Sequence, residues 1–185
     1  MRMTALPLQG AYCIEPTPFT DDRGFFARVY CREELAAIGV TKGIAQVNHS
    51  RSRTTGTIRG LHYQKPPHAE AKIVKCVRGA VFDVAVDLRR DSPTFLQWHG
   101  ELLSAENMRM LLVPEGFAHG FQSLEADSEV VYFVTEPYAP GCEGAVRFDD
   151  PRVGVRWPAP VTVVSDKDRA VPLLPADFAG LELLG

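Results

Sequence analysis

Two histidines lie in glycine-containing segments and are the side chains that point most directly to a chemical site. His62 lies in the segment Gly56–Gln64, and His119 lies in Pro114–Gly120. In the second segment, Pro114 and Gly116 predict a tight turn that presents His119. The ordinary histidine pKa of about 6.5 leaves the side chain partly neutral near pH 7, as a general base requires. One histidine in a strand is more often a packed residue, but two in such segments favour function.

The same two segments resemble the motifs of the cupin superfamily, G-x5-H-x-H and P-x-G-x-x-H. The second motif is matched by Pro114–His119, and the first is matched at His62. Gln64 replaces the second histidine of the first motif, and Glu70 stands only loosely in the usual Glu position, just before Lys72. A divalent transition metal usually needs three or four His, Cys or carboxylate ligands, and a nearby ammonium repels a cation. We therefore expect no metal and no other cofactor, so that side chains carry the chemistry.

The elements that must position these residues are short strands. Ala80–Leu88 and Val130–Thr135 are the clearest, because both are rich in branched and aromatic residues. We also expect strands at Gln46–Ser50, Thr57–Tyr63, Ala71–Val77, Met108–Val113 and Val161–Val164. A helix is expected at Arg32–Ile38, closed by Gly39, and the Pro-rich segment 157–175 is expected to wrap the fold or form short helices. Many short strands separated by turns favour a sandwich or barrel, here one domain over residues 1–185.

The strand Ala80–Leu88 has two different faces. Side chains alternate across a strand, so the even-numbered residues from Phe82 to Leu88 form one apolar face. Asp83 and Asp87 lie on the other face among small apolar residues. That face is either a solvated sheet surface, which is the more common case, or a polar cavity inside a barrel.

Composition limits the partners and the compartment. The 20 Lys and Arg against 23 Asp and Glu give a formal net charge of −3, and the basic residues are scattered, so no nucleic-acid surface is expected. No run of about 20 apolar residues and no secretory leader is found, which predicts a cytoplasmic protein without membrane contact. The four cysteines stand far apart without a C-x-x-C pair and are expected to be free thiols.

Several segments, in order along the chain, resemble the dTDP-4-dehydrorhamnose 3,5-epimerase family from about Pro7 to Leu174. They are Phe19–Phe26, Gln46–Asn48, Arg59–Gln64, Lys72–Val74, Asp83–Asp87, Pro114–Phe121 and Asp149–Pro151. The strings R-G-L-H-Y-Q and P-x-G-F-A-H-G-F are the most specific. The resemblance implies an all-β fold, namely a cupin-type double-stranded β-helix (jelly-roll) barrel with a few short helices at its periphery and C-terminus. It also implies an epimerase of nucleotide-diphospho-4-keto-6-deoxy sugars and a homodimer with exchanged N-terminal strands.

Epimerisation next to a ketone needs three groups. The hydrogens on C3 and C5 of a 4-keto sugar are acidified by the C4 carbonyl, so the enzyme must supply a base, a stabiliser for the enolate oxygen and an acid on the opposite face. We expect His62 to be the base and Lys72 to stabilise the enolate. The resemblance points to Asp168 as the carboxylate that orients His62, with Asp83 as a second candidate, and assigns Tyr132 as the proton donor.

The resemblance also implies residues that bind the substrate. Arg23 and Arg59 match positions that contact the nucleotide diphosphate, for which guanidinium groups are well suited. The other expected substrate contacts are His119, Gln46, Asn48, Phe26, Tyr138, Glu143 and Arg169. Of these, Gln46 and Asn48 can hydrogen-bond the base or sugar, and the two aromatic rings can stack on the base.

Three positions depart from the family pattern. Arg28 stands where the family usually carries Glu, Glu70 where it often has Gln, and Arg169 where Lys is common. The reversal at Arg28 leaves the nucleotide base open. A 3,5-epimerase, a 3- or 5-epimerase and an enzyme on a differently tagged sugar remain alternatives, as do two other classes: a metal-dependent cupin dioxygenase or isomerase, and a non-catalytic nucleotide-sugar-binding barrel.

Overall fold

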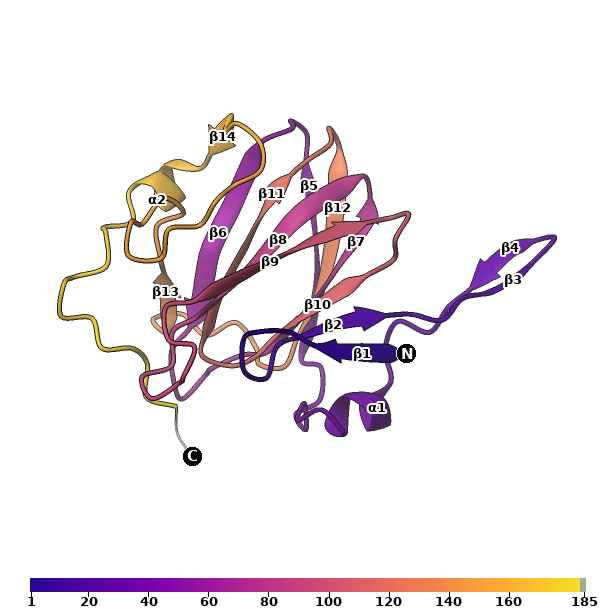
Figure 1. Cartoon of the computed structure of the whole chain (residues 1–185), viewed down its shortest axis with the longest axis horizontal. Helices are drawn as coiled ribbons and strands as arrows, with labels where there is room; N and C mark the ends of the chain where they lie inside the picture. The colour runs from indigo at the N-terminus through magenta and orange to yellow at the C-terminus, as the bar shows by residue number, and fades with distance from the viewer. Residues whose placement is uncertain (184–185) are drawn as a thin grey trace.

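Two β-sheets face each other and form a jelly-roll barrel of the cupin type in the computed structural model, which describes residues 1–183 (Figure 1). One sheet contains, in spatial order, β1 (Arg2–Ala5), β2 (Tyr12–Glu15), β10 (Met110–Val113), β7 (Lys72–Arg78), β12 (Ser128–Val134) and β5 (Gln46–Ser52). The other contains β13 (Glu143–Ala145), β6 (Thr57–Gln64), β11 (Phe117–Ser123), β8 (Ala80–Asp87) and β9 (Trp98–Ser104). β14 (Val163–Val164) pairs in parallel with β6.

The remaining elements lie outside the two sheets. β3 (Phe19–Asp21) and β4 (Gly24–Phe26) form a hairpin that projects away from the barrel (Figure 1). α1 (Arg32–Ala36) and α2 (Asp166–Arg169) are each about one turn long. No helix within residues 1–183 is long and apolar enough to cross a membrane.

Every strand expected from the sequence is present, with ends that differ by a few residues. The expected strand at Met108 begins only at Met110, because Met108 itself has a positive φ of 57°. The strands β1 to β4, β9 and β13 were not expected; most of them are short, and β9 is interrupted in its apolar pattern by Gly100. The expected helix ends at Ala36, two residues early.

Both faces of β8 are buried. Val81 and Ala85 pack inside the barrel, and Val84 and Val86 belong to a second apolar cluster on the outer face. The outer cluster is covered by side chains from the C-terminal part of the chain, among them Val146, Val153, Trp157, Leu174, Phe178 and Leu181. Of the two alternatives for the acidic face of β8, the interior of a barrel is therefore the one observed, and not the more common solvated surface. A wrapping segment covers the other face.

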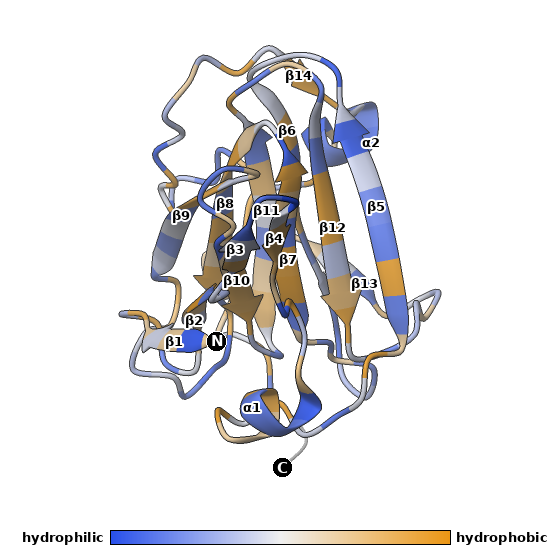
Figure 2. Ribbon diagram, turned by 90° about the vertical axis from the view of Figure 1, so that its right-hand side faces the viewer, coloured by the Kyte–Doolittle hydropathy of each residue, from blue (hydrophilic) through white to orange (hydrophobic). Residues whose placement is uncertain are grey.

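β5 forms an edge of its sheet and is mostly hydrophilic (Figure 2). It pairs only with β12 in the sheet order, in the register that sets Asn48 opposite Tyr132 and Gln46 opposite Val134. Polar side chains on the inner face of an edge strand leave this side of the barrel open to a polar ligand.

Candidate active site

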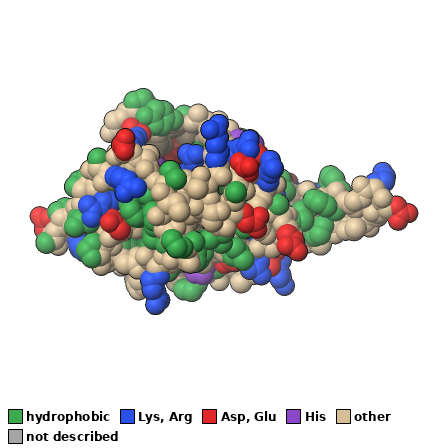
Figure 3. Space-filling model, turned by 90° about the horizontal axis from the view of Figure 1, so that it is seen from above, with side chains coloured by type: hydrophobic (Ala, Val, Ile, Leu, Met, Phe, Trp, Pro, Cys, Tyr) green, Lys and Arg blue, Asp and Glu red, His purple; other side chains and the backbone are tan. Residues whose placement is uncertain are grey.

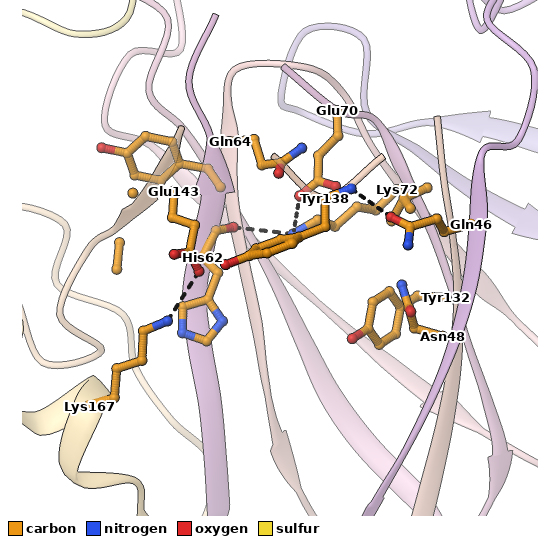
Figure 4. Close-up of a pocket in the computed structure, with 14 residues that line it drawn as sticks. Gln46, Asn48, His62, Gln64, Glu70, Lys72, Tyr132, Tyr138, Glu143 and Lys167 are labelled. Atoms are coloured by element: carbon orange, nitrogen blue, oxygen red, sulfur yellow. Dashed lines mark hydrogen bonds and ion pairs between the residues drawn. The ribbon is translucent and has the colours of Figure 1, made fainter. Parts of the chain in front are cut away.

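A cavity of about 430 Å³ lies between β5, β12 and β7 of one sheet and β6 and β13 of the other. The side chains around it come from both sheets (Figure 4). Its lining residues are Gln46, Asn48, His62, Tyr63, Gln64, Glu70, Lys72, Tyr132, Val134, Tyr138, Glu143, Gly144, Ala145 and Lys167. Seven of the residues expected to bind or transform a substrate thus line the cavity, together with an amide (Gln64), an acid (Glu70) and a lysine (Lys167) that were not expected there.

His62 is placed by a close approach of two strands. Gly60 has a φ of 126°, and a Cβ at this position would lie 2.5 Å from the Cα of Gly120 on β11. Only glycines permit this spacing of the two backbones. His62 and His119 are directly opposite each other in the same strand pair.

His62 is held by a carboxylate from a segment 106 residues away. Its Nε2 lies 2.6 Å from Oδ1 of Asp168, whose side chain is buried, whereas the His62 side chain is 45% exposed. Asp168 is placed by α2, where the Ser165 hydroxyl accepts a hydrogen bond from the Asp168 N–H at 3.1 Å. The carboxylate favours the tautomer protonated at Nε2 and leaves Nδ1 free to accept a proton.

Lys72 is buried and held on two sides. Its Nζ lies 3.1 Å from Oε1 of Glu70 and donates to the His62 backbone carbonyl at 3.4 Å. The side chains of Lys72 and Glu70 are 10% and 12% exposed. An ammonium so placed presents a fixed positive charge in the cavity that His62 lines.

Tyr132 comes from β12 of the opposite sheet and lies across the cavity from His62 (Figure 4). Burial raises the pKa of the Tyr132 phenol above its ordinary value of 10.0; the charge of Glu70 raises it further, and Arg59 partly opposes both. The phenol is therefore protonated at neutral pH and can act as an acid.

The edge of the cavity is closed by a hydrogen-bonded loop that follows β12. Gln46 Oε1 accepts from the Tyr138 N–H at 2.6 Å, and Gln64 Oε1 accepts from the Ala139 N–H at 2.7 Å. A hydrogen bond to Glu143 raises the pKa of Tyr138, and Lys167, whose Nζ is 3.1 Å from Glu143, lowers the pKa of that carboxyl. The glutamate is thus ionised between a phenol and an ammonium.

Asp83 and His119 lie outside the cavity lining. Asp83 is fully buried and binds His119 Nε2 at 2.9 Å, so it is not the partner of His62 for which it was the second candidate. Its other oxygen has no hydrogen-bond partner, and burial raises the pKa of the Asp83 carboxyl.

Four expected binding residues are also absent from the lining. Arg59 lies at the other end of β6 and donates to the Ser52 hydroxyl and the Arg51 carbonyl. Arg169 is exposed on α2. Arg23 and Phe26 lie on the projecting hairpin, where Arg23 is paired with Asp21. Because the hairpin projects away from the barrel, its residues do not line this cavity within one chain.

The chain was compared with known proteins. The family model described as dTDP-4-dehydrorhamnose 3,5-epimerase matches residues 5–176. The chain belongs to this family. The enzyme of this name from Salmonella typhimurium is 46% identical over 175 residues, which cover 92% of this chain and 93% of the relative.

Solved structures of the family have the same barrel. The Bacillus anthracis dTDP-4-dehydrorhamnose 3,5-epimerase with TDP and PPi bound superposes with a TM-score of 0.88 at 46% identity, covering 94% of this chain and 100% of the other. ChmJ, a 3'-monoepimerase from Streptomyces bikiniensis in complex with dTDP-quinovose, has a TM-score of 0.84 at 36% identity, with 91% and 85% coverage. None of these similarities favours a metal-dependent cupin or a non-catalytic barrel.

Some cavity residues of this epimerase-family chain were not identified from the sequence as parts of the site. Gln64 and Glu70 were noted only as departures, and Lys167 was passed over although it stands beside Asp168 in the string S-D-K-D. Lys167 could have been identified because it directly precedes Asp168, which was already predicted to belong to the site. Glu70 carried a weaker signal, namely its two-residue spacing from Lys72, which places both on the same side of an extended chain.

The donor set of the cavity does not resemble a metal centre. Within residues 1–183, no group of three His, Cys, Asp or Glu side chains has the spacing to hold an ion. The Gln64 amide, which replaces the second motif histidine, is engaged by backbone groups of His68, Pro137 and Ala139. Cations instead gather on the surface beside a hollow (Figure 3), where an anionic ligand is favoured.

Proposed function

We propose that this chain is an epimerase of a dTDP-linked 4-keto-6-deoxy sugar that moves protons with side chains alone. The observation that carries the proposal is that His62, held by the buried Asp168 carboxylate, lines one cavity together with Lys72 and Tyr132. Family membership supports the reaction class, and the ligands named for the solved relatives support a dTDP-linked substrate.

The mechanism follows from which group can accept a proton, which can stabilise negative charge and which can donate a proton. Nδ1 of His62 takes the proton from C3 or C5, and the electron pair of that C–H bond passes to the C4 oxygen as an enolate. The ammonium of Lys72, itself largely buried, stabilises the oxyanion. The Tyr132 hydroxyl returns a proton to carbon from the other face, and exchange with solvent resets the phenol and the imidazole.

Asp168 has a positioning part in this scheme. A buried carboxylate beside Nε2 stabilises the imidazolium formed after proton abstraction and keeps the ring in one tautomer. No metal is required, since the lysine supplies the positive charge that a Lewis acid would otherwise provide.

We further propose that the active form is a homodimer in which the β3–β4 hairpin of one subunit reaches the other. Three phenylalanines of the hairpin, Phe19, Phe25 and Phe26, are 65–73% exposed, and an isolated two-stranded hairpin is only marginally stable in water. In the dimer, Arg23 and Phe26 would meet the nucleotide diphosphate and base, together with Arg59.

We also propose that the protein is cytoplasmic, in keeping with its four unpaired cysteines.

The test is proton exchange with solvent. Incubation of dTDP-4-keto-6-deoxyglucose with the enzyme in deuterated water, followed by NMR, is expected to show deuterium at C3, and at C5 if both centres react. Treatment with a chelator should leave the rate unchanged. Absence of deuterium at both carbons would reject the assignment for this substrate, and deuterium at C3 alone would identify a 3-epimerase.

Tyr132→Phe separates the two proton transfers. Because His62 still abstracts a proton, this variant is expected to retain some exchange while losing inversion. A variant that inverts at the wild-type rate would show that another group donates the proton.

A further inference from the structure

Glu70 lines the cavity, and the proposed mechanism gives this acid no role. It lies just before β7, its side chain is 12% exposed, and its Oε1 is 3.1 Å from the Lys72 ammonium (Figure 4). Lys72 has one further hydrogen bond, the longer one to the His62 carbonyl. The carboxylate is therefore the principal anchor of the lysine head group.

Glu70 also acts electrostatically on Tyr132. Burial is the main cause of the raised pKa of Tyr132; the negative charge of Glu70 adds to it, and Arg59 opposes both. The other charged or titratable groups lining this cavity are Lys72 of β7, His62 and Tyr63 of β6, Tyr138 and Glu143 around β13, and Lys167 of α2. Among them, Glu70 is the acid paired with Lys72.

On the assumption that the proposed epimerase activity is right, we propose that Glu70 is a positioning residue that holds the Lys72 ammonium toward the enolate oxygen. From the same place, its negative charge opposes formation of the Tyr132 phenolate at alkaline pH. A four-carbon lysine side chain without a partner samples many rotamers, so an anchor preserves its geometry. Without the carboxylate, burial alone would oppose the effect of the Arg59 charge on the phenol, so the pKa of Tyr132 should fall.

Two substitutions separate the two parts of the proposal. In Glu70→Gln, the amide oxygen can still accept a hydrogen bond from Lys72, but the negative charge is gone. In Glu70→Ala, both are lost. Glu101→Gln is the matched control, because Glu101 is similarly buried (14% exposed) and paired with Arg109 at 2.9 Å, yet does not line the cavity.

The first measurement needs no substrate. Ultraviolet difference titration of tyrosinate, with Tyr132→Phe subtracted to isolate one of the five tyrosines, is expected to show the pKa of Tyr132 lower by about one unit in Glu70→Gln. Glu101→Gln should not move it. An unchanged Tyr132 titration in Glu70→Gln would overturn the electrostatic part, whether or not any sugar is epimerised.

The second measurement is the rate against pH. At neutral pH, kcat is expected to fall about tenfold in Glu70→Ala and to be largely rescued in Glu70→Gln, with KM nearly constant in both. The alkaline limb of kcat should move to lower pH in Glu70→Gln and stay in place in Glu101→Gln. Equal kcat values for wild type and Glu70→Ala would overturn the anchoring part; failure of the epimerase assignment itself would appear as inactivity of the wild type.

Discussion

Two aspartates four residues apart on β8 face the same interior and have opposite environments. Asp87, at one end of the barrel, receives hydrogen bonds from Arg89, Ser92 and Thr94, and these bonds outweigh burial and hold the pKa of its carboxyl below 3.8. Asp83, on which the Lys72 charge acts, has His119 as its one partner, an oxygen without a hydrogen bond and a raised pKa. Both are fully buried.

The difference separates a structural aspartate from one on which the Lys72 charge acts. At the Asp87 end, every acceptor is used, and Arg89 also lies over the ring of Phe117, 4.7 Å from its centroid. Such a satisfied network stabilises one structure. At Asp83, by contrast, one carboxylate oxygen is left without a hydrogen-bond partner, an incomplete pairing of the kind found near functional sites.

The largest effect should come from His62→Ala in the cavity. Loss of the general base is expected to reduce kcat about 10³-fold, roughly 4 kcal/mol in the barrier, while the free energy of unfolding changes by less than about 1 kcal/mol. Deuterium exchange and urea unfolding measure the two. His49→Ala is the control, because His49 forms a similar pair with Glu129 on the outer face of β5; activity lost equally in both variants would contradict the comparison.

Asp87→Asn is expected to have the opposite effect, a loss of stability without a loss of activity. Removing one charge of a buried ion pair leaves Arg89 without its partner, and we expect the free energy of unfolding to fall by about 3 kcal/mol. The folded variant should keep its kcat. Asp91→Asn, a change at an exposed aspartate nearby, should lie within about 0.5 kcal/mol of wild type; a loss of similar size there would show that the loop, and not the buried network, is sensitive.

The pH dependence of stability should differ in sign between the two aspartates. The lowered pKa of Asp87 means that its stabilisation is present above about pH 3.8 and is lost as pH falls through the folded value. The raised pKa of Asp83 means that stability declines as pH rises above 3.8. Denaturant unfolding over a pH series should therefore show the deficit of Asp87→Asn shrinking in acid. The stability of the Asp83→Asn variant should increase relative to that of the wild type as pH rises. If the stability of both variants followed that of the wild type in parallel over the pH series, the difference between the two aspartates would be refuted.

The smallest effect is expected for Asp83→Asn at neutral pH. The amide keeps an acceptor for His119 and removes a buried charge that has an unpaired oxygen, so the two changes oppose each other and stability should stay within about 1 kcal/mol of wild type. Thermal unfolding of this variant beside Asp87→Asn provides the measurement. A loss as large as that of Asp87→Asn would mean that both aspartates are structural.

Much of the fold was predictable because its signals are local. The two-residue alternation in Ala80–Leu88 placed Asp83 and Asp87 on one face, and branched residues identified β8 and β12 as strands. The short strands β1 and β13 have too few residues for such a pattern. In the site, Lys72 and Tyr132 were chosen largely because they match family strings, since a lysine or tyrosine on a strand is by itself unremarkable.

The sequence by itself determined the family, the barrel and the residue types for proton transfer, since these depend on motifs and on side-chain alternation. Only the tertiary structure decided that the acidic face of β8 is interior, that Asp168 and not Asp83 holds His62, and that Glu70 and Lys167 join the cavity. It also separated Arg23 and Phe26 from that cavity. The physical reason is that these relations join segments up to 106 residues apart, and the packing of whole sheets, rather than any local preference, brings such segments together or keeps them apart.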